Sequence, residues 1–233
     1  MTAETLGPYK LGPYDQDTWG IVTGDARELA RAIPDESVDL IFTDPVYDRI
    51  EDYRWLAETA ARVLKPDRAC LVWCSKPKQN KARSAMEDAG LAYVYTLDYT
   101  VIAKSYRLMF YHVFCWTTPC LWMAKGRSLP RYWIPDTVIS QNGTNGQHKW
   151  NKNPEAIITW LDAFSKPGAI VADFFCGGGT VPAVCKQLNR RWLAFEIDPD
   201  TAATARQRVQ QTQPPLPGLV VQQIELEFAE VAQ

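Results

Sequence analysis

Short apolar runs alternate with helical patterns along most of this chain, and this alternation constrains the fold more than any other feature. Four apolar runs have the length and composition of buried strands, namely residues 38–43, 69–74, 169–173 and 191–196. Each is followed by a segment that is predicted to be a helix, namely residues 51–64, where apolar residues recur at helical spacing, and residues 77–89, 180–189 and 199–211. This pattern predicts an α/β fold with a doubly wound, mostly parallel sheet.

The length and composition favour one domain over residues 1–233. A chain of 233 residues with 46% hydrophobic residues can bury one full core. It has no apolar run of about 18 residues and no apolar stretch near its start, which argues against a membrane span and a secretory signal. Its six cysteines form no CxxC pair and it has only two histidines. We therefore expect no metal site, and reduced cysteines in a cytoplasmic protein.

The middle of the chain differs from its flanks in charge and in pattern. Residues 76–152 hold eleven Lys or Arg and four Asp or Glu, a net charge of +7, whereas both flanks are acidic. Such a segment is typical of a face that meets nucleic-acid phosphates, although a solvated charged face has the same pattern. Residues 91–103 and 108–123 are predicted to form a hairpin around residues 104–107. Residues 124–152 form the longest irregular stretch, and loops of that length are usually functional or disordered.

A glycine-rich loop follows the predicted strand that ends at Asp173. Gly177, Gly178 and Gly179 precede the next helix, where glycine lets a ligand approach the backbone and the helix N-terminus favours a negatively charged group. Glu196 ends the next strand, 23 residues after Asp173, where a carboxylate can accept both hydroxyls of a ribose. The loop therefore predicts a site for an adenosine-containing cofactor, and the absence of a GxGxxG pattern disfavours NAD or FAD.

A second motif, the Asp-Pro-Val-Tyr sequence of residues 44–47, follows the strand predicted at residues 38–43. It resembles the Asp-Pro-Pro-Tyr motif of DNA amino-methyltransferases that use S-adenosylmethionine. Residues 173–180 resemble the Asp-Pro-Phe-x-Gly-x-Gly-Thr loop of the same family, although Val46 and Phe174 each stand where the family has Pro. The catalytic motif precedes the cofactor loop, which is the order of the β-class. The resemblance implies a Rossmann-like methyltransferase fold with a circularly permuted motif order.

The resemblance also implies roles for individual residues. An adenine amino nitrogen is a poor nucleophile because its lone pair is delocalised into the ring. The Asp44 carboxylate and the Pro45 carbonyl would accept its two N–H hydrogens, which favours a tetrahedral nitrogen. Tyr47 would stack on a base that has left the duplex. Asp25 would contact the cofactor's adenine ring, Glu196 its ribose, and the glycine loop its methionine part. The cofactor-binding residues implied are Asp25, Ala26, Asp173, Phe175, Cys176, Gly177, Gly179, Thr180 and Glu196.

The predicted partner is double-stranded DNA, and residues 124–152 stand where this family inserts its target-recognition region. The nucleic-acid contacts expected there are Lys125, Arg127, Arg131, Asn142 and Lys149. A second group of cations could meet phosphates, namely Lys76, Lys78, Lys81 and Arg83. Because the stretch is short for a recognition region, either the target site is short or a second subunit helps, in a homodimer or as a different chain.

The predicted reaction moves a methyl group from S-adenosylmethionine to the N6 nitrogen of adenine in DNA. Methylation of the cytosine N4 nitrogen is the first alternative. It is disfavoured because the family's cytosine enzymes more often carry Ser where this chain has Asp44. Two further alternatives are methylation of RNA and a catalytically silent subunit that binds cofactor or nucleic acid. Val46 is the one residue that favours a silent subunit, whereas Asp44, Pro45, Tyr47 and the glycine loop oppose it.

Overall fold

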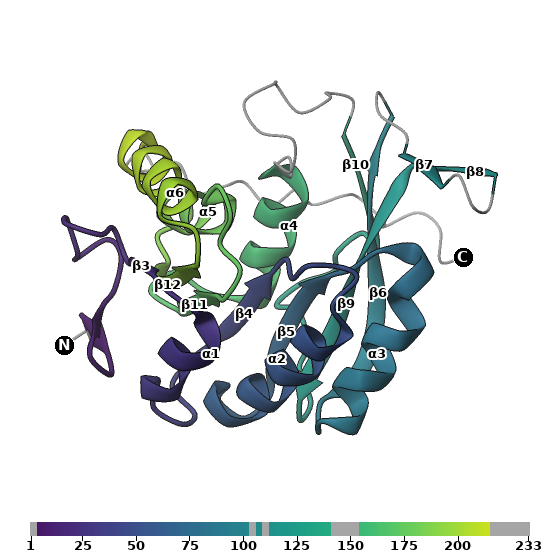
Figure 1. Cartoon of the computed structure of the whole chain (residues 1–233), viewed down its shortest axis with the longest axis horizontal. Coiled ribbons are helices and arrows are strands. Elements are labelled where there is room, and N and C mark those ends of the chain that lie inside the picture. The colour runs from purple at the N-terminus through teal and green to yellow at the C-terminus, as the bar shows by residue number, and fades with distance from the viewer. Residues whose placement is uncertain (1–3, 103–105, 109–111, 141–153, 215–233) are drawn as a thin grey trace.

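The computed structural model describes residues 4–102, 106–108, 112–140 and 154–214, and an eight-stranded sheet runs through its centre (Figure 1). Across the sheet the strands follow the order β10 (Thr137–Ser140), β6 (Ala92–Val101), β9 (Thr117–Lys125), β5 (Arg68–Trp73), β4 (Leu40–Thr43), β11 (Ile170–Asp173), β12 (Arg191–Glu196) and β3 (Ile21–Thr23). Of these eight strands, β9 alone runs against the others. The predicted α/β fold with a mostly parallel sheet is therefore confirmed.

The chain leaves the centre of the sheet in two directions. From β4 it continues to β5 on one side, and from β11 it continues to β12 on the other, while β4 and β11 are hydrogen-bonded neighbours. Doubly wound sheets bind their ligands at such a point, in the crevice outside the carboxyl ends of the strands. Both sequence motifs begin there, because Asp44 follows β4 and Asp173 ends β11.

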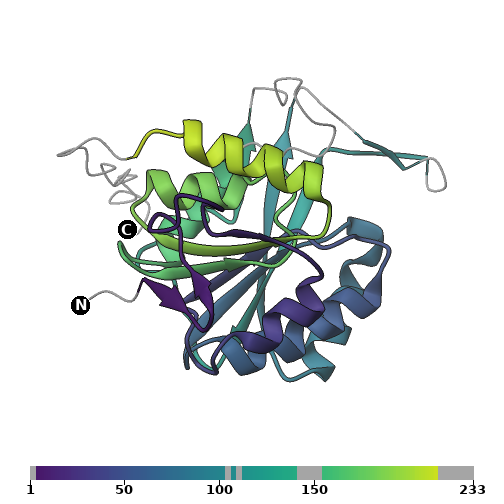
Figure 2. The ribbon, with the colours of Figure 1, turned by 60° about the vertical axis from the view of Figure 1, so that its left-hand side comes forward.

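Helices cover both faces of the sheet (Figures 1 and 2). One face carries α1 (Ala26–Leu29), α2 (Ile50–Val63) and α3 (Gln79–Asp88), with the 3-10 turns η1 (Ala30–Ala32) and η2 (Lys76–Lys78) adjoining α1 and α3. The other face carries α4 (Pro154–Phe164), α5 (Thr180–Gln187) and α6 (Pro199–Gln211). Burial on both faces explains why the central strands are continuously apolar. Within the described part of the chain, no helix combines the length and the apolarity that a membrane crossing requires.

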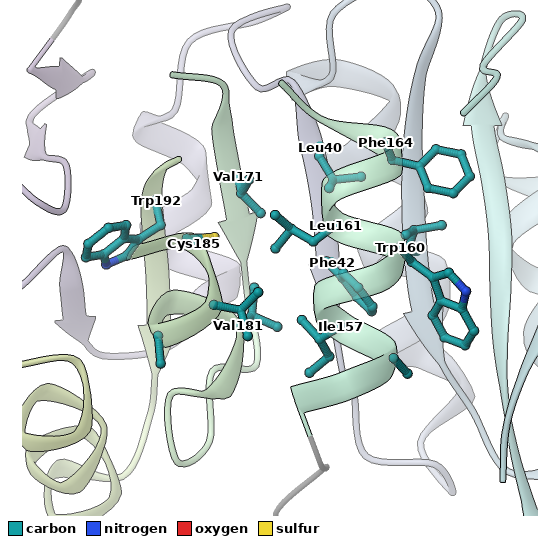
Figure 3. Packing of buried hydrophobic residues seen from close by; sticks show 14 of the residues in the cluster. Leu40, Phe42, Ile157, Trp160, Leu161, Phe164, Val171, Val181, Cys185 and Trp192 are labelled. Atoms are coloured by element: carbon teal, nitrogen blue, oxygen red, sulfur yellow. The ribbon is translucent and has the colours of Figure 1, made fainter. Parts of the chain in front are cut away.

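Successive residues of a central strand pack on opposite faces of the sheet. In β4, Leu40 and Phe42 belong to the cluster under α4, α5 and α6, whereas Ile41 belongs to the cluster under α1, α2 and α3. Figure 3 shows Leu161 of α4 pointing toward Val171 of β11. Each such fully buried side chain contributes about 1.5–3 kcal/mol relative to an exposed one. The two clusters hold β4 and β11 in register and thereby fix the position of the crevice.

The N-terminal segment closes the sheet beside β12. It contains β1 (Thr5–Leu6) and β2 (Tyr9–Lys10), which form a two-stranded antiparallel sheet. Gly12 then exchanges two backbone hydrogen bonds with Trp192, each of 3.1 Å. A Cβ atom on Gly12 would lie 2.0 Å from the Trp192 indole, so only glycine fits at this contact. An open strand edge invites pairing with other chains, and this segment covers the part of β12 that the short β3 leaves free.

Two segments differ from the sequence prediction. The turn predicted at residues 104–107 is wrong, because β7 (Tyr106–Leu108) pairs with β8 (Val113–Cys115) in a small sheet of its own. This hairpin projects from the edge of the molecule where β6 ends and β9 begins (Figure 2). In addition, β10 lies within the stretch expected to be irregular and pairs in parallel with β6. A strand of four residues is too short to show a reliable period of two.

Candidate active site at the strand ends

Side chains join the ends of β4 and β11. Thr43 Oγ1 donates a hydrogen bond to Asp173 Oδ1 at 2.7 Å and accepts one from the Phe175 N–H at 3.0 Å. Thr43 and Asp173 are both buried, so these bonds form away from water, where hydrogen bonds are electrostatically stronger. The loop after β4 and the glycine-rich loop after β11 therefore leave the sheet side by side.

The Asp-Pro-Val-Tyr segment leaves β4 with Pro45 buried, Asp44 and Tyr47 half-buried, and the Val46 side chain 54% exposed. The Tyr47 side chain is hydrogen-bonded to Asp44, and its pKa is raised first by burial and then by the charge of Asp44. The hydroxyl therefore stays protonated and donates to the carboxylate. Arg49 N–H donates to the Val46 carbonyl at 3.1 Å and closes the turn. Asp44 and Tyr47 thus lie together, while stacking of Tyr47 on a base stays a prediction.

Two glycines shape the loop after β11 in different ways. Gly177 and Gly179 have φ values of +50° and +75°, a left-handed conformation that glycine adopts without strain. A Cβ atom on Gly179 would lie 2.9 Å from the Ala205 side chain, so Gly179 lets the loop pack against α6. No atom of the described chain lies within 4 Å of a Cβ built on Gly177, which leaves room for a ligand. Thr180 then begins α5, whose first N–H groups have no partner within the helix and favour an anionic group.

Glu196 binds the same loop from the end of β12. Its Oε2 atom accepts a hydrogen bond from the Gly177 N–H at 2.8 Å, and its Oε1 atom accepts one from the Asp198 N–H at 3.0 Å. Each carboxylate oxygen keeps a second lone pair, so Glu196 can still accept hydroxyl donors such as those of a ribose. Cys176, the residue before Gly177, is buried and donates its N–H to the Phe195 carbonyl at 2.9 Å.

Asp25 lies beside Glu196 although the two are far apart in sequence. The Gly24 N–H donates to the Glu196 carbonyl at 2.9 Å, which continues the pairing of β3 with β12. Asp25 is exposed and caps α1 by accepting the Arg27 N–H at 2.8 Å, while Ala26, the first residue of α1, is buried. The strand ends therefore bring the predicted cofactor residues from β3, β11 and β12 to one edge of the sheet.

Three carboxylates, those of Asp44, Asp173 and Glu196, converge on this edge. Burial raises the pKa of Asp173 to about 7, against the hydrogen bonds from Thr43 and the Phe175 N–H, which lower it. The charges of Asp44 and Glu196 raise it further. Such a concentration of negative charge with a perturbed pKa is typical of a functional site and suits a cationic ligand.

Trp55 belongs to the candidate site although the sequence did not point to it. Trp55 of α2 contacts Phe174 and Phe175 edge to face, with ring centroids 6.0 and 5.9 Å apart. The Arg27 guanidinium lies 6.0 Å from the centre of the same indole ring. Together the rings form an apolar wall beside the glycine loop, suited to a flat ring such as adenine. No sequence signal singles out Trp55, because an amphipathic helix over residues 51–64 already accounts for an aromatic residue there.

Three of the cations predicted to contact nucleic acid lie at the opposite edge of the sheet. Lys125 ends β9 opposite Arg68, the first residue of β5, and its Nζ atom lies 3.0 Å from Glu36. The Arg127 N–H donates to Asp67, and the Arg131 guanidinium donates to carbonyls at the end of α4. The structure therefore does not bring Lys125, Arg127 and Arg131 to the strand-end site, because β9 runs against its neighbours. Asn142 and Lys149 lie outside the described residues.

Comparison with known proteins gives a family match over much of the chain. A family model described as DNA methylase, of the N6/N4 type, matches residues 56–207, about two thirds of the sequence. YubD of Escherichia coli (strain K12) is 26% identical over 195 residues, which cover 76% of this chain and 83% of YubD. The type II methyltransferase M.HpaI of Haemophilus parainfluenzae is 24% identical over 247 residues, which cover 81% and 73% of the two chains.

Solved structures match the fold over most of its length. A complex of M1.HpyAVI with SAM has a TM-score of 0.70 at 22% identity and covers 81% of this chain and 98% of its own. The PvuII DNA methyltransferase, described as cytosine-N4-specific, has a TM-score of 0.73 at 18% identity and covers 81% and 85%. At these identities the likeness establishes a shared fold.

Proposed function

The chain belongs to the N6/N4 DNA methylase family, and from that premise we propose that it moves a methyl group from S-adenosylmethionine to the N6 nitrogen of adenine in double-stranded DNA. The observation that carries the proposal is the contact between the ends of β4 and β11. It holds the Asp-Pro-Val-Tyr loop and the glycine loop against each other. A methyl acceptor held by Asp44 and a cofactor held over Gly177 would meet at this point.

The residues of the glycine loop fit a cofactor with a sulfonium, an adenosine and an amino-acid part. Such a cofactor would supply a methyl group on positively charged sulfur. Transfer to nitrogen would break the carbon–sulfur bond, leave a neutral thioether and place the positive charge on the nitrogen, which becomes neutral when it releases one N–H proton to solvent. The space over Gly177 admits the ligand, and the convergence of Asp44, Asp173 and Glu196 favours its positive charge. Trp55 and Phe175 offer an apolar wall for the adenine ring.

Asp44 and the Pro45 carbonyl hold the amino group of the target base in this proposal. Each accepts one N–H hydrogen, so the nitrogen lone pair turns out of the ring plane and toward the methyl group. The carboxylate of Asp44 already receives the Tyr47 hydroxyl, yet it has lone pairs for a further donor. Val46 does not oppose activity, because its side chain is exposed and the Arg49 hydrogen bond closes the turn without the second proline.

Duplex DNA would approach the carboxyl edge of the sheet. The projecting β7–β8 hairpin stands at this edge and exposes Phe114, and Trp116 follows it with its side chain 48% exposed. Lys76 and Lys78 follow β5 at the same edge and offer positive charge for phosphates. These residues replace Lys125, Arg127 and Arg131 as the proposed contacts. A target base must leave the helix to reach Asp44.

A matched pair of substitutions tests the function. Asp44→Ala should lower methyl transfer to unmodified duplex DNA by about 100-fold or more, because the acceptor amine loses its charged partner. Asp48→Ala is the control, since Asp48 lies in the same loop but is exposed and faces Lys78 at 3.7 Å. S-adenosylmethionine affinity, measured by calorimetry, should stay within about threefold in Asp48→Ala. In Asp44→Ala it should fall by about tenfold or less, far less than methyl transfer, because one of the three carboxylates near the sulfonium is lost. Full activity in Asp44→Ala, or no transfer by the unmodified protein, contradicts the proposal.

A further inference from the structure

A buried carboxylate on α2 has no part in the chemistry proposed above. Asp52 is 2% exposed and lies in the first turn of the helix, directly after the loop that carries the Asp-Pro-Val-Tyr motif. It shares the buried face of α2 with Leu56 and Ala60, one and two helical turns further on. A charged group at such a position needs partners, because burying an unpaired carboxylate is costly.

One partner of Asp52 comes from the cofactor side. The Arg27 guanidinium donates a hydrogen bond to Asp52 Oδ1. Arg27 belongs to α1, and its own N–H is the group that Asp25 caps. The same guanidinium lies beside the Trp55 ring, in the wall next to the glycine loop. Any shift of Asp25 or Trp55 on cofactor binding would therefore reach Asp52 through Arg27.

The other partner comes from the acceptor side. Arg49 Nε lies 3.3 Å from Asp52 Oδ2 in an ion pair, and among the described residues no group donates a hydrogen bond to this buried oxygen. Arg49 also closes the loop of residues 44–49, here called the acceptor loop. Its N–H donates to the Val46 carbonyl, and its own carbonyl accepts the Asp52 N–H at 3.0 Å. The conformation of the loop thus determines whether the buried Oδ2 atom has a counter-charge.

We propose that Asp52 is a positioning residue that couples cofactor binding to the arrangement of the acceptor loop. The proposal rests on the function given above. Removing one partner from a buried ion pair is strongly unfavourable, so Asp52 favours the state in which Arg27 and Arg49 are both in place. Occupation of the cofactor site, which holds α1 and Trp55, then favours the closed loop. Target DNA, which holds the loop, favours the cofactor site by the same factor.

The coupling is measured by calorimetric titration with sinefungin, a cofactor analogue whose amine cannot give up a methyl group. The analogue is titrated into the full chain with and without an unmethylated duplex, taken from the DNA fragments that the protein methylates. In the unmodified protein the duplex should tighten analogue binding by a factor within about 5–150. In Asp52→Asn the factor should fall to about one, since a neutral amide holds neither guanidinium by charge.

Two further variants separate coupling from folding. Arg49→Gln changes an exposed side chain, so it should fold normally and still lose most of the coupling. Asp162→Asn is the matched control, because Asp162 pairs with the buried Arg190 at 2.7 Å at the opposite edge of the sheet. It should lower the melting temperature and keep the coupling factor of the unmodified protein.

The outcomes distinguish the two proposals. If the unmodified protein binds the analogue and the duplex with a coupling factor above about five, and Asp52→Asn or Arg49→Gln keeps that factor, Asp52 has only a structural role and the inference is overturned. A factor below about five in the unmodified protein also overturns it, while the proposed function survives. Failure of the unmodified protein to bind the analogue at all contradicts the proposed function itself.

Discussion

Thr43 Oγ1 donates a hydrogen bond of 2.7 Å to Asp173 Oδ1, across the boundary between β4 and β11. The same hydroxyl oxygen accepts the Phe175 N–H, so one buried side chain ties the strand before the proposed acceptor loop to the loop that begins the proposed cofactor site. This contact joins residues that are 130 positions apart in sequence. It makes the geometry of each loop depend on the other.

Removing the Thr43 hydroxyl should change both the free energy of unfolding and the pKa of Asp173. Thr43→Val keeps the shape of the side chain but leaves the Asp173 carboxylate without its side-chain donor. We expect a loss of about 1–3 kcal/mol in the free energy of unfolding, measured with urea at pH 8. The pKa of Asp173 should also rise above about 7, since the Thr43 bond lowers it. Thr204→Val, which removes an exposed hydroxyl on α6, is the control and should change stability by less than about 0.5 kcal/mol.

The Asp173 carboxyl should make the stability of the cofactor-free protein depend on pH. Its pKa is about 7 in the folded chain and 3.8 is the ordinary value, so between these pH values the folded state binds more protons than the unfolded state. Stability from this group is therefore full below about pH 4 and is lost as pH rises toward 7. Asp173→Asn should remove that fall, and the difference between the two proteins in urea unfolding reports it. If the difference in the free energy of unfolding between the two proteins stays constant from about pH 4 to about pH 7, the assignment is refuted.

Ionisation of Asp173, which lowers the stability of the cofactor-free protein as pH rises, should strengthen cofactor binding over the same pH range. A sulfonium binds best beside an ionised carboxylate, so the dissociation constant for S-adenosylmethionine should fall by about tenfold between pH 6 and pH 8. The neutral thioether product should show a smaller change. Calorimetry at constant ionic strength measures both. Equal pH profiles for the unmodified protein and Asp173→Asn would contradict a role for this charge.

Val46 can be replaced by the proline that the family motif carries. The Val46 N–H makes no hydrogen bond to another described residue and its side chain is exposed, so proline removes no contact. Val46→Pro should raise the free energy of unfolding by about 0.4–1 kcal/mol, because proline lowers the conformational entropy of the unfolded chain. It should keep or increase the turnover rate. Steady-state kinetics beside thermal unfolding measure both. A tenfold loss of turnover would show that the loop needs a conformation that proline forbids.

The central fold could be predicted because its signals are local. Residues 40–43 and 170–173 are mostly apolar runs buried on both faces. Asp44 follows the first run and Asp173 ends the second, and these acids mark the carboxyl edge of the sheet, where ligands bind in such folds. The glycine loop could be predicted for the same reason, since Gly177 and Gly179 adopt the left-handed backbone that the pattern implies. Short elements such as β10 gave no signal of comparable length.

Long-range placement could not be predicted in the same way. Lys125 ends β9 and Arg131 follows it, so the direction of this strand decides at which edge of the sheet they lie, and β9 runs against its neighbours. The net charge of a sequence segment does not depend on strand direction, so it cannot show at which edge of the sheet a cation lies. The burial of Asp52 did have a signal, since it precedes Leu56 and Ala60 at helical spacing. Its partners Arg27 and Arg49 depend on how α1 packs against α2, which no local pattern contains.

The identity of the methylated base tests the central claim most directly. Unmodified duplex DNA of mixed sequence is incubated with the protein and S-adenosylmethionine carrying an isotope-labelled methyl group, then digested to nucleosides and analysed by mass spectrometry. We expect labelled N6-methyladenine, absent when Asp44→Ala replaces the unmodified protein. Labelled N4-methylcytosine would overturn the base assignment, and the absence of any labelled nucleoside would contradict methyl transfer to DNA.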